Sequence, residues 1–162
     1  MEKIRKFYFQ VDENIVAFME RYGIMLLRVS LGGVFLWFGA LKFFPGLSPA
    51  DGIASATIEK LTFGLLPPHV SIIILATWET LIGIGLISGV YLRVTLFLLF
   101  TQMLGTITPL FFFPFETFSR LPYAPTLEGQ YIIKNLVLIS AGLVIGSTVG
   151  GGSRAKRGSP AN

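Results

Sequence analysis

The chain has no cysteine and a single histidine among its 162 residues. Without cysteine it cannot carry out thiol–disulfide exchange, ligate an iron–sulfur cluster through thiolates or attach haem covalently. Two axial histidines for a buried haem are also excluded. His69 follows two prolines in a predicted loop and is better explained as an interfacial residue than as a ligand. We expect no metal site and no covalently bound cofactor, so any redox cofactor would belong to a partner or diffuse in the lipid.

Charge is also scarce, since 14% of the residues are charged and 52% are hydrophobic. A soluble domain carries about 25% charged residues. Four mostly apolar stretches, at about 24–44, 70–89, 92–112 and 130–149, are long enough to cross a hydrocarbon core about 30 Å thick at 1.5 Å rise per residue. The sequence therefore predicts an all-α membrane protein, an antiparallel bundle of four transmembrane helices in the cell membrane.

The basic residues indicate how this bundle is oriented. With both termini in the cytoplasm, the two external loops contain only Lys60 and Arg120, as the positive-inside bias requires. The basic residues placed inside are then Lys3, Arg5, Lys6, Arg21, Arg93, Arg154, Lys156 and Arg157. The net charge of +4 is explained by topology, and we expect no binding to nucleic acid.

The sequence divides into three segments. Residues 1–22 predict an amphipathic helix on the cytoplasmic face, lying on lipid or against a partner helix. Its apolar stripe consists of Ile4, Tyr8, Val11, Ile15, Phe18 and Tyr22. Residues 23–149 form the transmembrane domain, and residues 150–162 have the composition of a disordered basic cytoplasmic tail.

Two helix starts can be predicted in the external loops. In the first loop, Ser48 is placed to cap a short helix at the outer interface, with Asp51 in its first turn, and Pro67 and Pro68 end this helix. Before the last span, Thr126 is placed to cap the helix and Glu128 lies in its first turn.

The predicted spans contain ionisable side chains, each of which costs roughly 2.5 to 3.5 kcal/mol at a helix centre. They are Arg28, Lys42, Glu79, Arg93 and Lys134. Arg28 and Arg93 lie near the cytoplasmic ends, where long side chains reach the headgroups, and we assign them structural or topological roles. In the first span, Arg28, Gly32, Phe35, Gly39 and Lys42 recur at helical spacing. We expect this face to point into the bundle.

Apart from the two arginines, the ionisable side chains and three neutral polar ones form a set in the predicted outer half of the membrane. Glu79 lies roughly 14 Å from the outer end of its span at helical rise and is too deep to reach the surface. The set comprises Lys42, Glu79, Gln102, Thr106, Lys134 and Asn135. One interpretation is structural: Glu79 pairs with Lys134 or Lys42 to fix helix packing, where polar contacts average about 0.6 kcal/mol. The other is a cavity whose lysine, glutamine and asparagine donors bind the carbonyl oxygens of a ligand, with Glu79 as the catalytic candidate that accepts or relays a proton.

Two segments resemble the DoxX family of small membrane proteins. They are LLRVSLGGVFLWFGALKFFPG, residues 26–46, which is similar to the first-span signature, and APTLEGQYIIKNLVLISAGLV, residues 124–144, which is similar to the last span, including that of a YkgB-related branch. The similarity extends over most of residues 20–147. It implies a four-helix protein of the cytoplasmic membrane, whose relatives are associated with quinone-linked thiosulfate oxidation and with complexes that protect against oxidants.

These observations support two main hypotheses about function. The first is a small subunit of a membrane redox system that uses a diffusible quinone at the polar set. The second is a non-catalytic anchor or assembly factor for a membrane oxidoreductase. A solute or ion transporter is less favoured, because broken helices paired across inverted halves are absent from the pattern. The expected partners are the lipid bilayer and soluble or membrane oxidoreductase subunits, and a homo-oligomer is compatible with the sequence.

Overall fold

The structure, a computed structural model, describes residues 2–48 and 50–150. It is built almost entirely from helices, four of which are long and apolar enough to cross a membrane, as predicted. In chain order the elements are α1 (Glu2–Leu41), α2 (Asp51–Leu61), α3 (Pro68–Ser88), α4 (Leu92–Ile107), α5 (Pro109–Phe112), α6 (Pro114–Thr117), β1 (Phe118–Arg120), β2 (Ala124–Pro125) and α7 (Leu127–Thr148). The predicted tail lies outside the described residues from position 151 onward.

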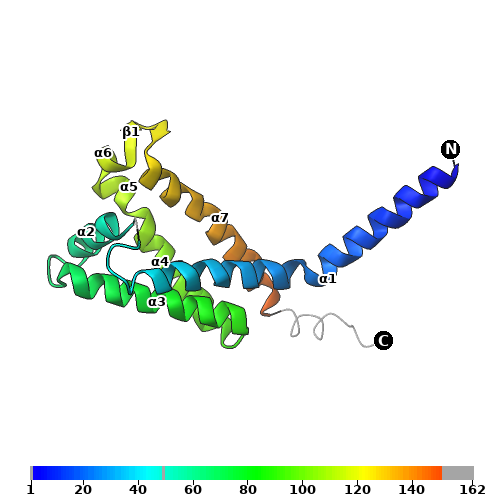
Figure 1. Cartoon of the computed structure of the whole chain (residues 1–162), viewed down its shortest axis with the longest axis horizontal. Coiled ribbons are helices and arrows are strands. Elements are labelled where there is room, and N and C mark those ends of the chain that lie inside the picture. The colour runs from blue at the N-terminus through cyan, green and yellow to red at the C-terminus, as the bar shows by residue number, and fades with distance from the viewer. Residues whose placement is uncertain (1, 49, 151–162) are drawn as a thin grey trace, which may run out of the picture.

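Helix α1 continues through both the predicted amphipathic segment and most of the first span. Its N-terminal part extends away from the other helices and changes direction relative to the part that packs in the bundle (Figure 1). Large apolar side chains on this extension are exposed, among them Phe9, Ile15 and Phe18. The helix ends at Leu41, three residues before the predicted end of the span, and residues 42–44 continue as a turn.

The ends of the other helices follow from local chemistry. Pro68, whose missing N–H is no loss at a helix start, begins α3, and Gly89 ends it with a left-handed φ of 73°. Thr126 caps α7 as predicted, since its hydroxyl accepts a hydrogen bond from the Gly129 N–H at 3.2 Å. This cap starts α7 three residues before the predicted span.

Helix α2 lies within the first predicted loop and packs against α3 (Figure 1). Asp51 occupies its first turn as predicted, but the prediction that Ser48 caps it is wrong. The N-cap position is Ala50, which makes no side-chain cap, and the Ser48 carbonyl instead accepts from the Asp51 N–H at 3.4 Å.

The prediction that Pro67 and Pro68 end this helix is also wrong, because α2 ends at Leu61. The backbone turns out of the helix at Phe63 and Gly64, which have positive φ angles of 55° and 76°, and Pro68 begins α3 instead.

The third predicted span is interrupted near its C-terminal end. Helix α4 stops at Ile107, and α5 begins at Pro109, which has no N–H to continue the ladder of α4. The short helix α6 and an antiparallel pair of strands, β1 and β2, then connect to α7. This region covers the same end of the bundle as α2 (Figure 1).

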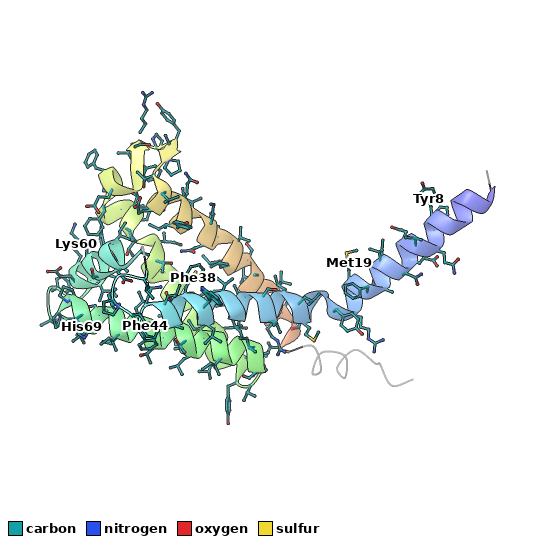
Figure 2. The ribbon with its side chains drawn as sticks, in the orientation of Figure 1. Tyr8, Met19, Phe38, Phe44, Lys60 and His69 are labelled. Atoms are coloured by element: carbon teal, nitrogen blue, oxygen red, sulfur yellow. The ribbon has the colours of Figure 1, made fainter. Side chains whose placement is uncertain are left out.

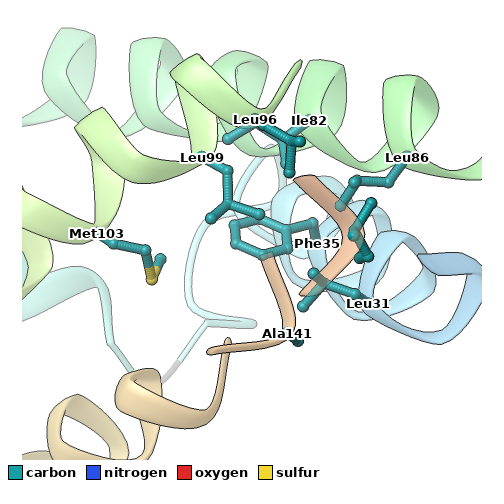
Figure 3. Close-up of a cluster of buried hydrophobic side chains, with 9 residues drawn as sticks. Leu31, Phe35, Ile82, Leu86, Leu96, Leu99, Met103 and Ala141 are labelled. Carbon is teal, nitrogen blue, oxygen red and sulfur yellow. The ribbon is translucent and has the colours of Figure 1, made fainter. Parts of the chain in front are cut away.

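The bundle core is apolar and draws on all four long helices (Figure 3). Its buried members are Leu31, Phe35, Ile82, Leu86, Leu96, Leu99, Met103, Ala141 and Ile145. Beside this core, α1 and α3 approach so closely that glycine is required where their backbones meet. A Cβ on Gly83 would lie 2.5 Å from the Leu36 nitrogen, and one on Gly39 would lie 2.8 Å from the Thr80 nitrogen. Small residues let membrane helices come this close.

Replacing Gly83 by alanine tests this contact. The added methyl group meets α1 backbone, so we expect Gly83→Ala to lower the free energy of unfolding by about 1–3 kcal/mol. Thermal unfolding in detergent measures the effect. The control is Gly33→Ala, because a Cβ on Gly33 meets nothing within 4 Å. Equal unfolding midpoints for the two variants would contradict the close approach of α1 and α3.

Candidate functional site

A buried carboxylate with two donors lies where three of the long helices meet. The Lys42 Nζ donates to the Glu79 Oε2 at 2.6 Å, and the Gln102 Nε2 donates to the Glu79 Oε1 at 2.8 Å. All three residues are buried, with exposed fractions of 9%, 8% and 8% for Lys42, Glu79 and Gln102. The structure therefore brings together three of the predicted site residues in what we call the Glu79 triad.

The positions of these three side chains follow from the helices that carry them. Lys42 lies in the turn after α1 and also reaches the Phe38 carbonyl at 3.5 Å, where the negative end of the helix dipole favours a cation. Glu79 is near the middle of α3. Because Gly39 has no side chain, α3 lies close to α1 at this level, and a Cβ on Gly39 would be 2.9 Å from that of Glu79. The close contact of α1 and α3 thus supports the ion pair.

A second polar contact joins α4 to α7. The Asn135 Nδ2 donates to the Thr106 Oγ1 at 3.2 Å, and the Thr106 hydroxyl donates to the Met103 carbonyl at 3.0 Å. Thr106 is four residues after Gln102, so both side chains lie on one face of α4. The two sets together connect all four long helices near the same level.

Lys134 is placed differently from the other predicted site residues. Its side chain is exposed on α7, with the Nζ 5.6 Å from the centre of the Tyr131 ring. Adjacent side chains on a helix point about 100° apart, so Lys134 cannot face α4 when Asn135 does. Of the two ion pairs considered from the sequence, the structure contains the one with Lys42.

The two arginines lie at the opposite end of the bundle from the triad. Arg28 is half-buried, and its guanidinium group lies directly against Gly89, the residue that ends α3. There the cation offsets the partial negative charge of the α3 C-terminus. Arg93 is exposed in the first turn of α4.

Asp51 lies in the first turn of α2, which packs against α3. Its Oδ1 is buried without a hydrogen-bond partner in the described structure. The Oε1 of Gln102 is likewise buried and unpartnered there. The sequence indicated only that Asp51 belongs to a helix start, because nothing in the spacing shows that α2 lies over α3.

Two cavities of the described structure are lined by residues outside the triad. One of about 460 Å³ is lined by Ala56, Glu59, Lys60, Phe63, Gly64 and Phe113. Its Lys60 Nζ donates to the Phe112 carbonyl at 3.2 Å and lies 4.4 Å from the centre of the Phe113 ring. A second cavity of about 290 Å³, on the surface of α3 and α4, is almost wholly apolar and is lined by Ile73, Ile74, Thr77, Trp78, Leu81 and Leu98.

His69 is exposed at the start of α3, at the same end of the molecule as Lys60 (Figure 2). Across residues 2–48 and 50–150, no three histidine or acidic side chains come together in a group that could hold a metal ion.

The fold and the triad define a small helical membrane protein with four spans and a buried, hydrogen-bonded ion pair at one end of the bundle. The family model of DoxX matches residues 23–114, more than half of the chain, and the chain belongs to the DoxX family. This match covers α3, α4 and the part of α1 that packs in the bundle, and so includes every member of the triad. Neither the curated proteins nor the solved structures contain a match.

The ion pair can be tested with a double-mutant cycle on Lys42 and Glu79. Lys42→Met leaves a buried carboxylate without its counterion, and we expect a loss of about 3 kcal/mol in the free energy of unfolding. Adding Glu79→Gln removes the stranded charge and should restore part of this loss. Chemical unfolding in detergent gives the four values, with Lys134→Met as the exposed control. Purely additive effects of the two substitutions would contradict the pair.

Proposed function

We propose that this protein is a small integral-membrane subunit of a redox system, and that it binds a quinone and exchanges protons with it at the Glu79 triad. The observation that carries this proposal is a buried carboxylate on α3 that accepts from a lysine in the turn after α1 and from a glutamine on α4. Ionisable groups in membrane spans are costly and most often mark a pathway or a binding site. Membership of the DoxX family, whose proteins are often linked to quinone-related redox systems, supports the same assignment.

The chemistry of the triad suits a quinone. The two quinone carbonyl oxygens accept hydrogen bonds, and the donors available are the Lys42 ammonium and the Gln102 amide. Reduction to the quinol adds two electrons and two protons. In this proposal the electrons come from a partner oxidoreductase subunit, and Glu79 passes protons to or from the quinone oxygen. Thr106, one turn after Gln102 on α4, and Asn135, which contacts it from α7, are further candidates for binding the ring.

The apolar cavity on α3 and α4 supports the proposal from the lipid side. Trp78 precedes Glu79 in the sequence, and Leu98 lies one helical turn before Gln102, so the cavity reaches the level of the triad. A hydrophobic quinone chain suits such a lining. The site would lie in the outer half of the cell membrane if both termini are cytoplasmic, with the partner subunit docking at the membrane surface.

Quinone binding by the purified protein in nanodiscs tests this function. We expect the wild type to bind a water-soluble short-chain quinone, and Glu79→Gln to raise Kd by about tenfold, which corresponds to roughly 1.4 kcal/mol. Lys134→Met serves as the control, because its side chain lies away from the triad and should leave Kd unchanged. Thermal unfolding of each variant separates lost binding from lost stability. The absence of quinone binding by the folded wild type would refute the proposal.

The second candidate function, a non-catalytic anchor or assembly factor, is favoured by the N-terminal extension of α1. This part of the helix stands apart from the bundle (Figure 2). Val11, Ile15 and Phe18 of its apolar stripe are exposed. An apolar stripe of this kind fits a lipid surface or the groove of another protein.

Deletion of residues 1–20 distinguishes the two candidates. An anchor should lose co-purification of its partner when the extension is removed, whereas a quinone site in the bundle should keep its Kd. The paired measurement uses chemical cross-linking in native membranes for partner association and the nanodisc assay for quinone. Unchanged cross-linking after deletion would contradict an anchoring role for the extension.

A further inference from the structure

We propose that the cavity between the end of α2 and the end of α5 binds the phosphoethanolamine headgroup of a membrane phospholipid, with Lys60 holding the phosphate and Glu59 the ammonium. The site lies outside the Glu79 triad and does not depend on the proposed quinone chemistry. The cavity volume of about 460 Å³ lies within the range of ligand pockets, about 300–1,000 Å³.

The cavity wall contains one acid and one base that do not pair with each other. Glu59 and Lys60 are consecutive residues near the end of α2, and both are exposed. Among the residues that the structure describes, no ion pair joins them, and the Glu59 carboxylate has no other basic partner. A ligand that satisfies both side chains must itself carry one anionic and one cationic group.

Lys60 is held in place and still has donors to offer. Its Nζ donates to the Phe112 carbonyl at 3.2 Å and lies 4.4 Å from the centre of the Phe113 ring. An ammonium group has three N–H donors, and the carbonyl uses one of them. The remaining N–H groups suit a phosphate, whose oxygens accept charge-assisted hydrogen bonds.

The other half of the headgroup is matched by the C-terminal end of α2. The last carbonyls of a helix carry a partial negative charge, and Glu59 adds a full one at the same place. A primary ammonium donates hydrogen bonds to a carboxylate, whereas the trimethylated nitrogen of choline has no N–H to donate. The site is therefore expected to prefer ethanolamine to choline lipids.

The position of the cavity favours a lipid over a soluble ligand. Helix α2 connects α1 to α3, two of the helices that can cross a membrane, so it lies at the membrane surface, where headgroups are found. Phe63 lines the cavity and is 92% exposed, and Leu65 nearby is 81% exposed. Large apolar side chains grouped on a surface mark a membrane or protein contact. Beside a bound headgroup they would contact the glycerol and the first part of the acyl chains.

The backbone that presents Phe63 supports the same conclusion. Phe63 has a positive φ of 55°, which is costly for a bulky side chain, and the turn is closed by the Gly64 N–H, which donates to the Glu59 carbonyl at 2.8 Å. Such strain persists at binding sites, where a contact offsets it. Because the Phe63 ring is almost fully exposed, packing within the described chain does not offset this cost, whereas contact with a lipid would.

Native mass spectrometry of the full chain in detergent tests the site. The delipidated protein is mixed with equal amounts of phosphatidylethanolamine, phosphatidylcholine and phosphatidylglycerol that have identical acyl chains. We expect the wild type to retain phosphatidylethanolamine about tenfold more than phosphatidylcholine, the effect of one charged hydrogen bond. We expect Lys60→Met to lower phosphatidylethanolamine retention about tenfold for the same reason. Glu59→Gln should abolish the preference over phosphatidylcholine.

The matched controls are Arg120→Met and Glu116→Gln. They remove one exposed charge of each sign at the same end of the bundle but outside the cavity, and they should leave the preference unchanged. Ala56→Leu fills part of the cavity while keeping both charges, and it should lower phosphatidylethanolamine retention. Thermal unfolding of each variant shows that the protein remains folded.

Equal retention of the three lipids by the wild type, or highest retention of phosphatidylglycerol, would overturn the proposal. A preference for phosphatidylethanolamine that survives both Lys60→Met and Ala56→Leu would also overturn it. Soluble glycerophosphoethanolamine distinguishes a lipid from a free compound with the same headgroup, and we expect it to displace the lipid only in large excess. Displacement at equal concentration would overturn the assignment to a lipid.

Discussion

The close approach of α1 and α3 is the contact on which the rest of the structure depends. Gly39 and Gly83 remove the side chains that would hold the two helices apart, and Lys42, one turn beyond Gly39, then reaches Glu79. The buried Lys42 Nζ and Glu79 Oε2 lie 2.6 Å apart. A wider separation of α1 and α3 would leave two unpaired charges in the interior, which is costly. Steric packing and electrostatics are therefore coupled at one level of the bundle.

Helix α4 extends this coupling to the rest of the molecule. Gln102 faces the carboxylate of α3, and Thr106, one turn later, faces Asn135 of α7. In a membrane, apolar side chains gain little by leaving lipid for each other, so these polar contacts and the fit of small residues help to decide which helix faces meet. The apolar core on the other side of this level, around Phe35 and Leu99, fills the remaining space.

Sequence reasoning found the four spans, the inward face of the first span and the Thr126 cap, because hydropathy, helical spacing and capping chemistry are local properties. It also gathered Lys42, Glu79 and Gln102 by depth alone. It placed both Lys134 and Asn135 in the site, whereas Lys134 is exposed in the structure, because depth does not give the rotation of α7 about its axis. The packing of α2 against α3 was missed for a related reason: it is set by tertiary packing and leaves no periodic signal in the sequence.

A buried ion pair is weak evidence for stability, since well-packed apolar residues often serve as well or better. Helix packing alone would therefore explain a polar contact such as that of Thr106 with Asn135, but it does not require a lysine and a glutamate in a membrane bundle. The Gln102 Oε1 points in the same direction: it belongs to the amide that binds Glu79 and has no hydrogen-bond partner among the described residues, whereas a purely structural cluster gains by satisfying every buried acceptor. The energetic cost of the triad is therefore an argument for the proposed proton exchange at Glu79 rather than for helix association alone.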